Sequence, residues 1–301
     1  MTIEYAIIVK NKTRLETLIE RFNTKAQAKF YIESLGGDFA DYEIEHEQFQ
    51  TALSLVQRRL SKILKNKTID RSFLPSFLFQ NNQLILVIGQ DGLVANTAKY
   101  VHQLPIIAIN PDPPRYDGVL LPFNAQNFLQ IVEKVLNNHY QIKMVHLAEA
   151  VLNDGQRLLA FNDLFIGVSS HTSARYKISF LEKQENQSSS GIIVSTKMGS
   201  TGWLSSVFNM VNALHKTKRP LTSSFKENEL MFVVREPFQS KTSQTHLTAG
   251  ILKHSNRLII ESFMPTNGVI FSDGIESDFL TFNAGSIATI GIAQQTAQLV
   301  I

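Results

Sequence analysis

The first half of the chain arranges its apolar residues in two alternating patterns. Continuous apolar runs at residues 5–9, 84–88 and 105–109 are typical of strands that are buried on both faces of a sheet. Apolar residues at helical spacing predict helices at residues 13–22, 24–36, 45–64, 93–101 and 123–138. Strands that alternate with helices in this way predict a Rossmann-like parallel sheet with helices on both faces.

The pattern changes beyond residue 141. Short apolar and alternating runs now recur at close spacing, separated by turn signals such as Asn153-Asp154-Gly155. One helix, expected at residues 202–214, interrupts them, and the polar run at 184–190 is expected to form a loop. The sequence therefore predicts two domains. They are an N-terminal parallel α/β domain at 1–140, to which 286–301 return, and a C-terminal β-rich, sandwich-like domain at 141–285.

Composition narrows the class of protein. The 301 residues are 44% hydrophobic and 18% charged, which is the balance of a soluble globular protein. The net charge of +3 gives no reason to expect nucleic acid, and the absence of Cys excludes disulfides and thiolate metal sites. The N-terminal apolar run is too short for a signal peptide or a membrane span, so we expect a cytoplasmic protein without membrane contact.

The most informative local feature is the loop Gly89-Gln90-Asp91-Gly92, which directly follows the apolar run at 84–88. Glycines at the carboxyl end of a buried strand let backbone N–H groups approach an anion, and the next helix would point its positive end toward that anion. An acid in such a loop repels a phosphate unless it has a task, such as accepting a proton from a hydroxyl. The simpler alternative is a βα turn with Asp91 as the helix N-cap.

Three further motifs follow in order along the chain. They are Asn162-Asp163, the segment STKMGSTGW that ends at Trp203, and the late turn Asp273-Gly274. With the GxDG loop before them, they resemble the NAD kinase family, whose pattern is a GGDG loop, an Asn-Glu pair, the segment STPTGSTAY and an Asp-Gly turn. The match extends from about residue 84 to residue 290, and the run from Ile109 to Arg115 is similar to the mitochondrial-type branch of that family.

This resemblance implies an NAD kinase-like phosphotransferase. It would transfer a phosphoryl group from ATP, or from a related donor, to the adenosine-ribose 2′-hydroxyl of NAD and so form NADP. Mg²⁺ would bind through the nucleotide phosphates, and the eight His residues show no metal-ligand spacing, so no metal site of the protein itself is expected. We also expect a homo-oligomer.

The resemblance also assigns roles to residues. It implies Asp91 as the catalytic base and a phosphate loop made of Gly89, Gln90 and Gly92. The residues that it implies for NAD binding are Asn162, Asp163, Thr201, Gly202, Trp203 and Ser206. In this scheme the Asn-Asp pair holds ribose hydroxyls, the Thr lies beside the adenine, and the Trp offers a flat face to the nicotinamide or ribose. The structural alternatives are a plain β-turn for the pair and a core position at the domain interface for the Trp.

Several positions depart from the family pattern. Gln90 stands where Gly is usual, Leu93 where Thr is usual, and Ser190 where many members carry an Asp that contacts the substrate. If residue 90 needs a positive φ, Gln costs roughly 1 kcal/mol; if φ is negative, its side chain crowds the phosphate path or donates an amide to it. Arg115 is either a solvated turn residue or a phosphate ligand.

These departures keep two other functions open. One is a kinase of the same superfamily that acts on a lipid or sugar hydroxyl, because GGDG loops occur there too. The other is a non-catalytic protein that binds a dinucleotide. The Asn-Asp pair favours a nucleoside diol as the acceptor over a lipid or a sugar.

Overall fold

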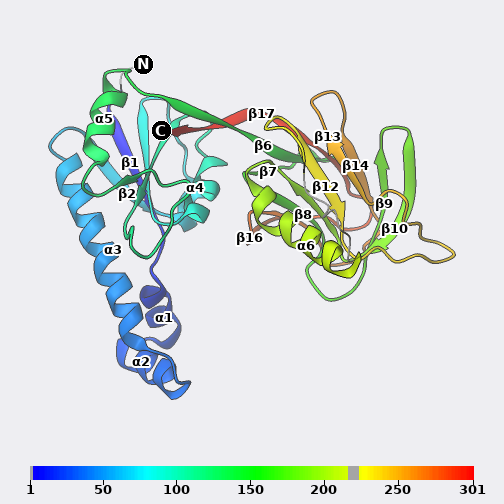
Figure 1. Ribbon diagram of the computed structural model, residues 1–301, viewed down its shortest axis with the longest axis horizontal. Coiled ribbons are helices and arrows are strands. Elements are labelled where there is room, and N and C mark those ends of the chain that lie inside the picture. The colour runs from blue at the N-terminus through cyan, green and yellow to red at the C-terminus, as the bar shows by residue number, and fades with distance from the viewer. Residues whose placement is uncertain (1–2, 216–223) are drawn as a thin grey trace. The chain divides into compact units, whose positions relative to one another are not determined.

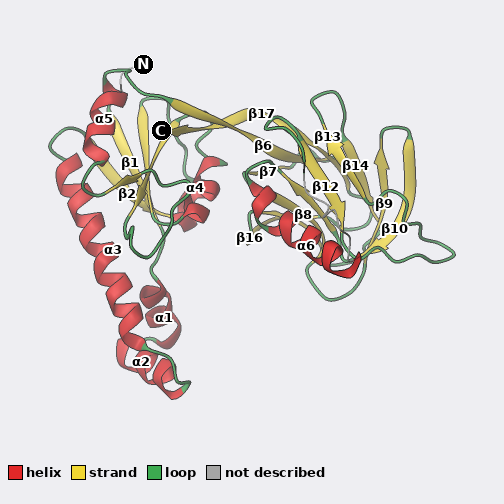
Figure 2. Ribbon diagram, viewed as in Figure 1, coloured by secondary structure: helices red, strands yellow, loops and turns green. Residues whose placement is uncertain are grey.

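The computed structural model describes residues 3–215 and 224–301, and the chain forms two compact units (Figures 1 and 2). The first unit comprises Met1–Lys143 and Gln298–Ile301, and the second comprises Met144–Ala297. The chain enters the second unit within strand β6 (Ile142–Leu152) and leaves it within strand β17 (Ile287–Val300). The sequence placed these boundaries at 140/141 and 285/286, and the second differs because β17 runs on through most of its length in the second unit.

A parallel sheet forms the centre of the first unit. Its strands are β1 (Tyr5–Lys10), β2 (Lys65–Asp70), β3 (Gln83–Ile88) and β4 (Pro105–Asn110), in the order β4-β3-β1-β2. The last residues of β17 add a parallel strand beside β4, with Gln298 opposite Pro105, and the short β5 (Phe123–Asn124) also pairs with β4. The carboxyl ends of β3 and β4 therefore lie side by side, which is where open α/β sheets bind ligands.

Helices α3 (Phe39–Leu60) and α5 (Phe128–Leu136) cover one face of this sheet, and α4 (Asp91–Ala98) with the short 3₁₀ helix η1 (Arg71–Ser76) lies outside their core. Helices α1 (Arg14–Phe22) and α2 (Lys25–Ser34) do not cover the sheet; they pack on each other and on the start of α3 in a separate small core (Figure 1). Helices α3 and α5 share one core with alternate strand residues such as Ile8 and Leu86, and α4 packs on β3 and β4 outside that core. The intervening residues Ile7 and Val87 are equally buried, as expected for a sheet that is covered on both sides.

Helix boundaries depart from the sequence prediction for local reasons. Helix α3 begins six residues earlier than expected, because Asp38 caps it by accepting the backbone N–H of Ala40 at 2.9 Å. Helix α4 begins at Asp91 rather than at residue 93, with Gln90 in the N-cap position. The interpretation of Asp91 as the N-cap was therefore wrong.

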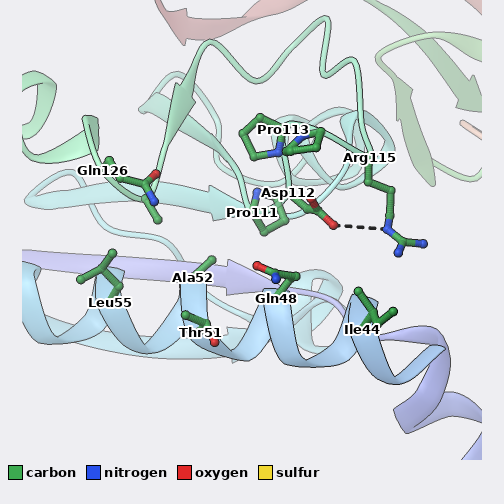
Figure 3. A pocket seen from close by; sticks show the side chains of 12 residues that line it. Ile44, Gln48, Thr51, Ala52, Leu55, Pro111, Asp112, Pro113, Arg115 and Gln126 are labelled. Atoms are coloured by element: carbon green, nitrogen blue, oxygen red, sulfur yellow. Dashed lines mark hydrogen bonds and ion pairs between the residues drawn. The ribbon is translucent and has the colours of Figure 1, made fainter. Parts of the chain in front are cut away.

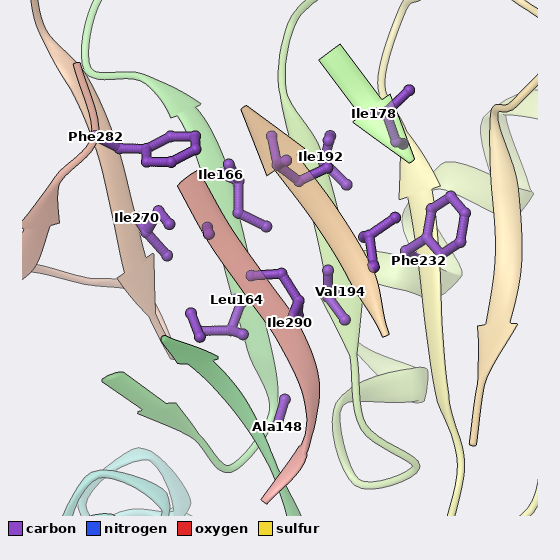
Figure 4. Packing of buried hydrophobic residues seen from close by; sticks show 14 of the residues in the cluster. Ala148, Leu164, Ile166, Ile178, Ile192, Val194, Phe232, Ile270, Phe282 and Ile290 are labelled. Carbon is purple, nitrogen blue, oxygen red and sulfur yellow. The ribbon is translucent and has the colours of Figure 1, made fainter. Parts of the chain in front are cut away.

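The second unit is β-rich, and its two sheets pack on a common core (Figure 4). The first sheet has the order β13-β12-β11-β8-β15-β16, with strands Ala249–Leu252, Leu230–Val234, Ile192–Ser195, Asp163–Val168, Gly268–Ser272 and Ile275–Thr281. In the second, β10 (Lys183–Ser189), β9 (Ala174–Phe180), β14 (Leu258–Ser262) and β17 are neighbours in that order, and β6 and β7 (Arg157–Ala160) also pair there. Ile166 and Ile192 of one sheet join Ile178, Ile260 and Ile290 of the other in the core. The α/β domain and the β-rich domain expected from the sequence are both confirmed.

Two further features of the second unit concern the sequence predictions. The helix expected at 202–214 is α6 (Trp203–His215), preceded by the 3₁₀ turn η2 (Gly199–Thr201). The loop expected at 184–190 is wrong, because this polar run is strand β10, paired antiparallel with β9. Gln187 and Ser189 are buried there and hydrogen-bond to the Tyr176 hydroxyl at 3.1 and 2.7 Å. Within the described residues, no helix is long and apolar enough to cross a membrane.

Candidate functional site

The GxDG loop lies where β3 ends and α4 begins. The N–H of Gly89 donates to the carbonyl oxygen of Ile109 at 3.3 Å, which joins the loop to the end of β4. A Cβ at Gly89 would lie 2.9 Å from Cδ2 of Leu93, so a side chain here would displace the end of the Leu93 side chain. A Cβ at Gly92 would meet nothing within 4 Å. Protein packing does not explain the second glycine, and the free space beside it lies at the positive end of α4, where an anion binds well.

Gln90 adopts an extended backbone, with φ −102° and ψ 167°. A residue with a side chain adopts these angles without strain, so the substitution of Gly by Gln costs no backbone energy here. The side-chain amide of Gln90 hydrogen-bonds to the hydroxyl of Tyr116, in the loop between β4 and β5. Burial raises the pKa of Tyr116, and the bond with Gln90 partly opposes this. The amide is therefore directed to the protein itself rather than across the phosphate path.

Asp91 is held by the same β4–β5 loop. Its Oδ1 accepts the backbone N–H of Leu120 at 2.9 Å, and its Oδ2 accepts that of Val119 at 3.1 Å. One N–H on each oxygen fixes the plane of the carboxylate. An ionised carboxylate has about four acceptor sites, so each oxygen can still accept one more proton donor.

An ion-pair network anchors this loop to the helices. Arg115 contacts Asp41 of α3 at 2.6 Å and Asp112 at 3.2 Å, and Asp41 also contacts Arg14 of α1 at 2.7 Å. Arg14 and then Arg115 lower the pKa of Asp41, because both guanidinium groups donate to its charged form. Arg115 therefore has two carboxylate partners while its side chain stays partly exposed.

In the second unit, the Asn-Asp pair is held by the late Asp-Gly turn. The carboxylate of Asp273 accepts three successive backbone N–H groups, from Phe161 at 3.1 Å, Asn162 at 2.6 Å and Asp163 at 3.2 Å. The motif at 273 was identified from the sequence only as a turn. Its carboxylate fixes the backbone that presents the Asn162 and Asp163 side chains.

The STKMGSTGW segment, which begins at the end of β11, is hydrogen-bonded to the same turn. Thr196 donates its N–H to the carbonyl oxygen of Asn162 at 2.8 Å and its hydroxyl to that of Phe161 at 2.6 Å. A Cβ at Gly199 would lie 2.4 Å from the Asn162 carbonyl oxygen and 2.8 Å from Oδ1 of Asp163. Only glycine allows so close an approach, and the STKMGSTGW segment is thereby brought against the Asn-Asp pair.

The carboxyl group of Asp163 lies in an unusual environment. Its pKa is raised to about 7, chiefly by burial; a hydrogen bond with Ser195 opposes the shift, and the nearby charge of Asp273 adds to it. Its Oδ1 is buried and makes no hydrogen bond with any residue that the structure describes. A buried acceptor without a partner is expensive, and a hydroxyl donor from a ligand would satisfy it.

The remaining residues implied for NAD binding lie at the start of α6. Thr201, Gly202 and Ser206 are exposed, and the Ser206 hydroxyl donates back to the Gly202 carbonyl oxygen at 3.4 Å. Trp203 is half-buried and stacks on Phe165, with ring centroids 5.6 Å apart and planes inclined by 12°. Cζ of Arg235 lies 5.3 Å from the centroid of the Trp203 ring. The indole thus packs against two side chains of the second unit.

Each unit gathers its own set of these residues. The first holds Gly89, Gln90, Asp91 and Gly92 together, and the second holds Asn162, Asp163 and the segment through Gly199 together. Sequence reasoning missed Tyr116 and Asp41, because their partners lie 26 and 74 residues away and no local pattern marks such pairs. In the described part of the chain, no three His, Asp or Glu side chains cluster as metal ligands would.

Comparisons with known proteins support the motif resemblance. No family model matches the chain. A probable NADH kinase of Oryza sativa subsp. japonica is 24% identical over 216 residues, which cover 64% of this chain and 62% of the rice protein. An NAD kinase of Caldicellulosiruptor saccharolyticus is 28% identical over 167 residues, which cover 52% of this chain and 60% of that protein. The chain thus spans about three fifths of the length of these curated relatives.

Two solved structures share the fold over nearly all of the chain. The crystal structure of yeast NADH kinase complexed with NADH gives a TM-score of 0.63 at 14% identity, covering 100% of this chain and 84% of that one. The crystal structure of an NAD kinase from Archaeoglobus fulgidus in complex with ATP gives 0.55 at 15% identity, covering 99% and 93%. At these identities the likeness to the two structures shows the fold alone.

Proposed function

We propose that this chain, a member of the NAD kinase family, transfers the terminal phosphoryl group of ATP to the 2′-hydroxyl of the adenosine ribose in NAD or NADH. The observation that carries the proposal is the Asp91 carboxylate, which two backbone N–H groups orient beside the open N-terminus of α4. The relatives are named for NAD and for NADH, so both forms of the acceptor belong to the proposal. It also includes a homo-oligomer and a cytoplasmic location.

The proposed reaction needs a base and a phosphate site in one place. The 2′-oxygen forms the new bond to the γ-phosphorus, the bond from that phosphorus to the bridging oxygen breaks, and ADP leaves with the electron pair. Asp91 accepts the hydroxyl proton on a free acceptor site of its carboxylate. The N–H groups at the start of α4, with the space beside Gly92, would hold the phosphates.

The Asn-Asp pair would hold the acceptor. An ionised Asp163 accepts a hydroxyl hydrogen bond on its unpartnered Oδ1, and Asn162 presents an amide from the same turn. Asp273 keeps this turn in place without touching the ligand. Two neighbouring ribose hydroxyls match these two short side chains better than the isolated hydroxyl of a lipid does.

Mg²⁺ fits this arrangement only as a companion of the nucleotide. Asp91 lies near the proposed phosphate position, but the described residues offer no carboxylate cluster around it. The ion would bind mainly to phosphate oxygens and water, as Mg²⁺ does in many kinases, and would neutralise charge on the transferred group.

One assay tests the proposal. Purified protein is incubated with ATP, Mg²⁺ and either NAD or NADH, and NADP(H) is measured with a dehydrogenase that is specific for it. Formation of NADP(H) that depends on all components supports the proposal. Tight binding of NADH without any NADP(H) would instead establish the non-catalytic alternative. Transfer from radiolabelled ATP only to a lipid or sugar added in place of NAD(H) would establish the other kinase. Light scattering of the same sample reports whether it is a homo-oligomer.

A further inference from the structure

The first unit contains a cavity that the GxDG loop does not account for. It has a volume of about 630 Å³ and lies between α3 and the β4–β5 loop, at the carboxyl edge of the sheet (Figure 3). This volume is in the range of small-molecule sites. Every residue that lines it belongs to the first unit.

The walls of the cavity are suited to a flat ring. Pro111 and Pro113 form one wall, and Ile44 and Leu55 of α3 face them from the other (Figure 3). Rigid proline rings and branched aliphatic side chains present apolar surfaces between which an aromatic heterocycle packs well.

Three of the polar side chains that line the cavity carry no charge. The lining includes the side-chain amides of Gln48 and Gln126 and the hydroxyl of Thr51, and Gln48 and Thr51 are exposed. Amides that both donate and accept can read the edge of a nucleobase.

Charge on the lining is already neutralised. Its two charged residues, Asp112 and Arg115, pair with each other at 3.2 Å, and Arg115 also pairs with Asp41 at 2.6 Å. A phosphate would gain no free cation here. The cavity therefore suits an uncharged ring rather than an anion.

The cavity borders the loop that would hold the phosphates. Pro111 follows the end of β4, whose Ile109 accepts the N–H of Gly89. Arg115 on its rim precedes Tyr116, which hydrogen-bonds to Gln90. The residues between the cavity and the GxDG loop are thus neighbours along the chain or through hydrogen bonds, as one ligand with its base in the cavity and its phosphates at the start of α4 would require.

We infer that this cavity binds the base of the nucleoside triphosphate donor. The inference rests on the proposed function, and it assigns the donor's base to residues outside the motifs of the sequence. Gln48 and Thr51 are then specificity-determining residues for the donor, whereas the affinity for NAD(H) does not depend on them.

Thr51→Trp tests the inference, because residue 51 is exposed on α3 and an indole there would fill the cavity. Ser54→Trp is the matched control, since Ser54 is exposed on the same helix and does not line the cavity. We expect Thr51→Trp to raise the KM for ATP by about 10-fold or more while the KM for NADH changes less than about two-fold. Ser54→Trp should leave both values unchanged.

Calorimetry tests the inference by binding alone, so the result does not depend on whether the protein forms NADP(H). A non-hydrolysable ATP analogue and inorganic triphosphate, which lacks a base, are titrated into each protein. Thr51→Trp should weaken the analogue about 10-fold and leave the triphosphate unchanged. Equal weakening of both probes, or no change in either, overturns the inference even in a protein that forms no NADP(H).

Gln48→Ala provides a second test in case the Thr51→Trp variant does not fold. It removes one amide and little volume, so we expect the wild-type preference between ATP and GTP analogues to shrink several-fold while NADH binding is kept. An unchanged preference in a folded variant contradicts a role of Gln48 in reading the base.

Discussion

Asp163 links protonation to stability at the scale of a single residue. Its pKa of about 7 in the folded protein lies above the usual value of 3.8, chiefly because the carboxyl group is buried. Between these two values the folded protein holds a proton that the unfolded chain has released. The stabilising contribution of this proton is complete below about pH 4 and is lost as the pH rises through 7.

Asp163→Asn should remove this pH dependence, because the amide stays neutral. We expect the unfolding free energy of the variant relative to wild type to increase between pH 5 and pH 8. At the higher pH the buried Asp163 of the wild-type protein is ionised, and this charge destabilises the folded state. Urea unfolding followed by circular dichroism at both values measures this. Glu276→Gln, which removes an exposed carboxylate of β16, controls for net charge. The same stability difference at both pH values would contradict the burial of Asp163.

Asp91→Asn addresses the chemistry at the same scale. Asn retains a carbonyl oxygen for only one of the N–H groups of Val119 and Leu120, and it is not basic. Phosphoryl transfer should fall by roughly 10² to 10⁴, the usual contribution of a general base, while NADH binding stays within a few-fold. Single-turnover kinetics and calorimetry on one preparation measure the two quantities. Turnover near the wild-type rate at saturating substrates would refute the role of Asp91.

At the scale of elements, hydrogen bonds couple the GxDG loop to the β4–β5 loop. The β4–β5 loop supplies the N–H groups for Asp91 and the hydroxyl for Gln90, and Arg115 ties it to α1 and α3 through Asp41. Rigidity of the GxDG loop therefore depends on residues outside it. Since the backbone of Gln90 is extended, exchange of Gln90 for Gly would relieve no strain and would only release this contact.

A double-mutant cycle tests the coupling of the two loops. Tyr116→Phe and Gln90→Ala each remove the same hydrogen bond, so each should cost on the order of 1 kcal/mol of unfolding free energy. The double variant should cost little more than either single one, because the bond can be lost only once. Chemical denaturation of the four proteins gives the coupling energy. Additive costs would show that the two side chains do not interact.

Elements defined by local pattern were predictable, and those defined by distant partners were not. The apolar run at 84–88 and its glycines gave β3 and the turn into α4, and a capping box at Thr13 and Glu16 supports the early helix. The sequence of strand β10 predicts a loop because residues such as Gln187 and Ser189 are polar. Their burial depends on the Tyr176 hydroxyl of the neighbouring strand, which no local window contains.

The same distinction between local patterns and distant partners applies to the candidate site. Asp91, Asn162 and Asp163 stand in motifs and were found from the sequence alone. Which groups hold them was not predictable, because Asp273 is more than 100 residues from the turn that it organises. The protein groups beside the Trp203 ring, Phe165 and Arg235, were likewise not predictable, because no local window contains them.

At the scale of the whole molecule, the chain returns to its first unit at the end. Val300 is 1% exposed and belongs to the core shared by α3, α5 and the parallel sheet, and Leu299 pairs with Ile106. The stability of the N-terminal unit thus depends on residues from the far end of the sequence.

Val300→Ala should therefore destabilise the first unit by about 1–3 kcal/mol through loss of buried apolar volume. Hydrogen exchange should show faster opening of β3 and β4, while β8 and β11 of the second unit keep their protection. Ile301→Ala is the matched control, since that side chain is 54% exposed. Uniform loss of protection in both units would mean that they unfold together.

The stacked indole provides a built-in optical reporter. Trp203 is the only tryptophan in the chain, so its emission comes from one place, the start of α6 beside Phe165 and Arg235. Reduced nicotinamide absorbs in the near-ultraviolet region where indole emits, and the oxidised form does not. Quenching by energy transfer would therefore distinguish bound NADH from bound NAD in a single titration, without a label and without turnover.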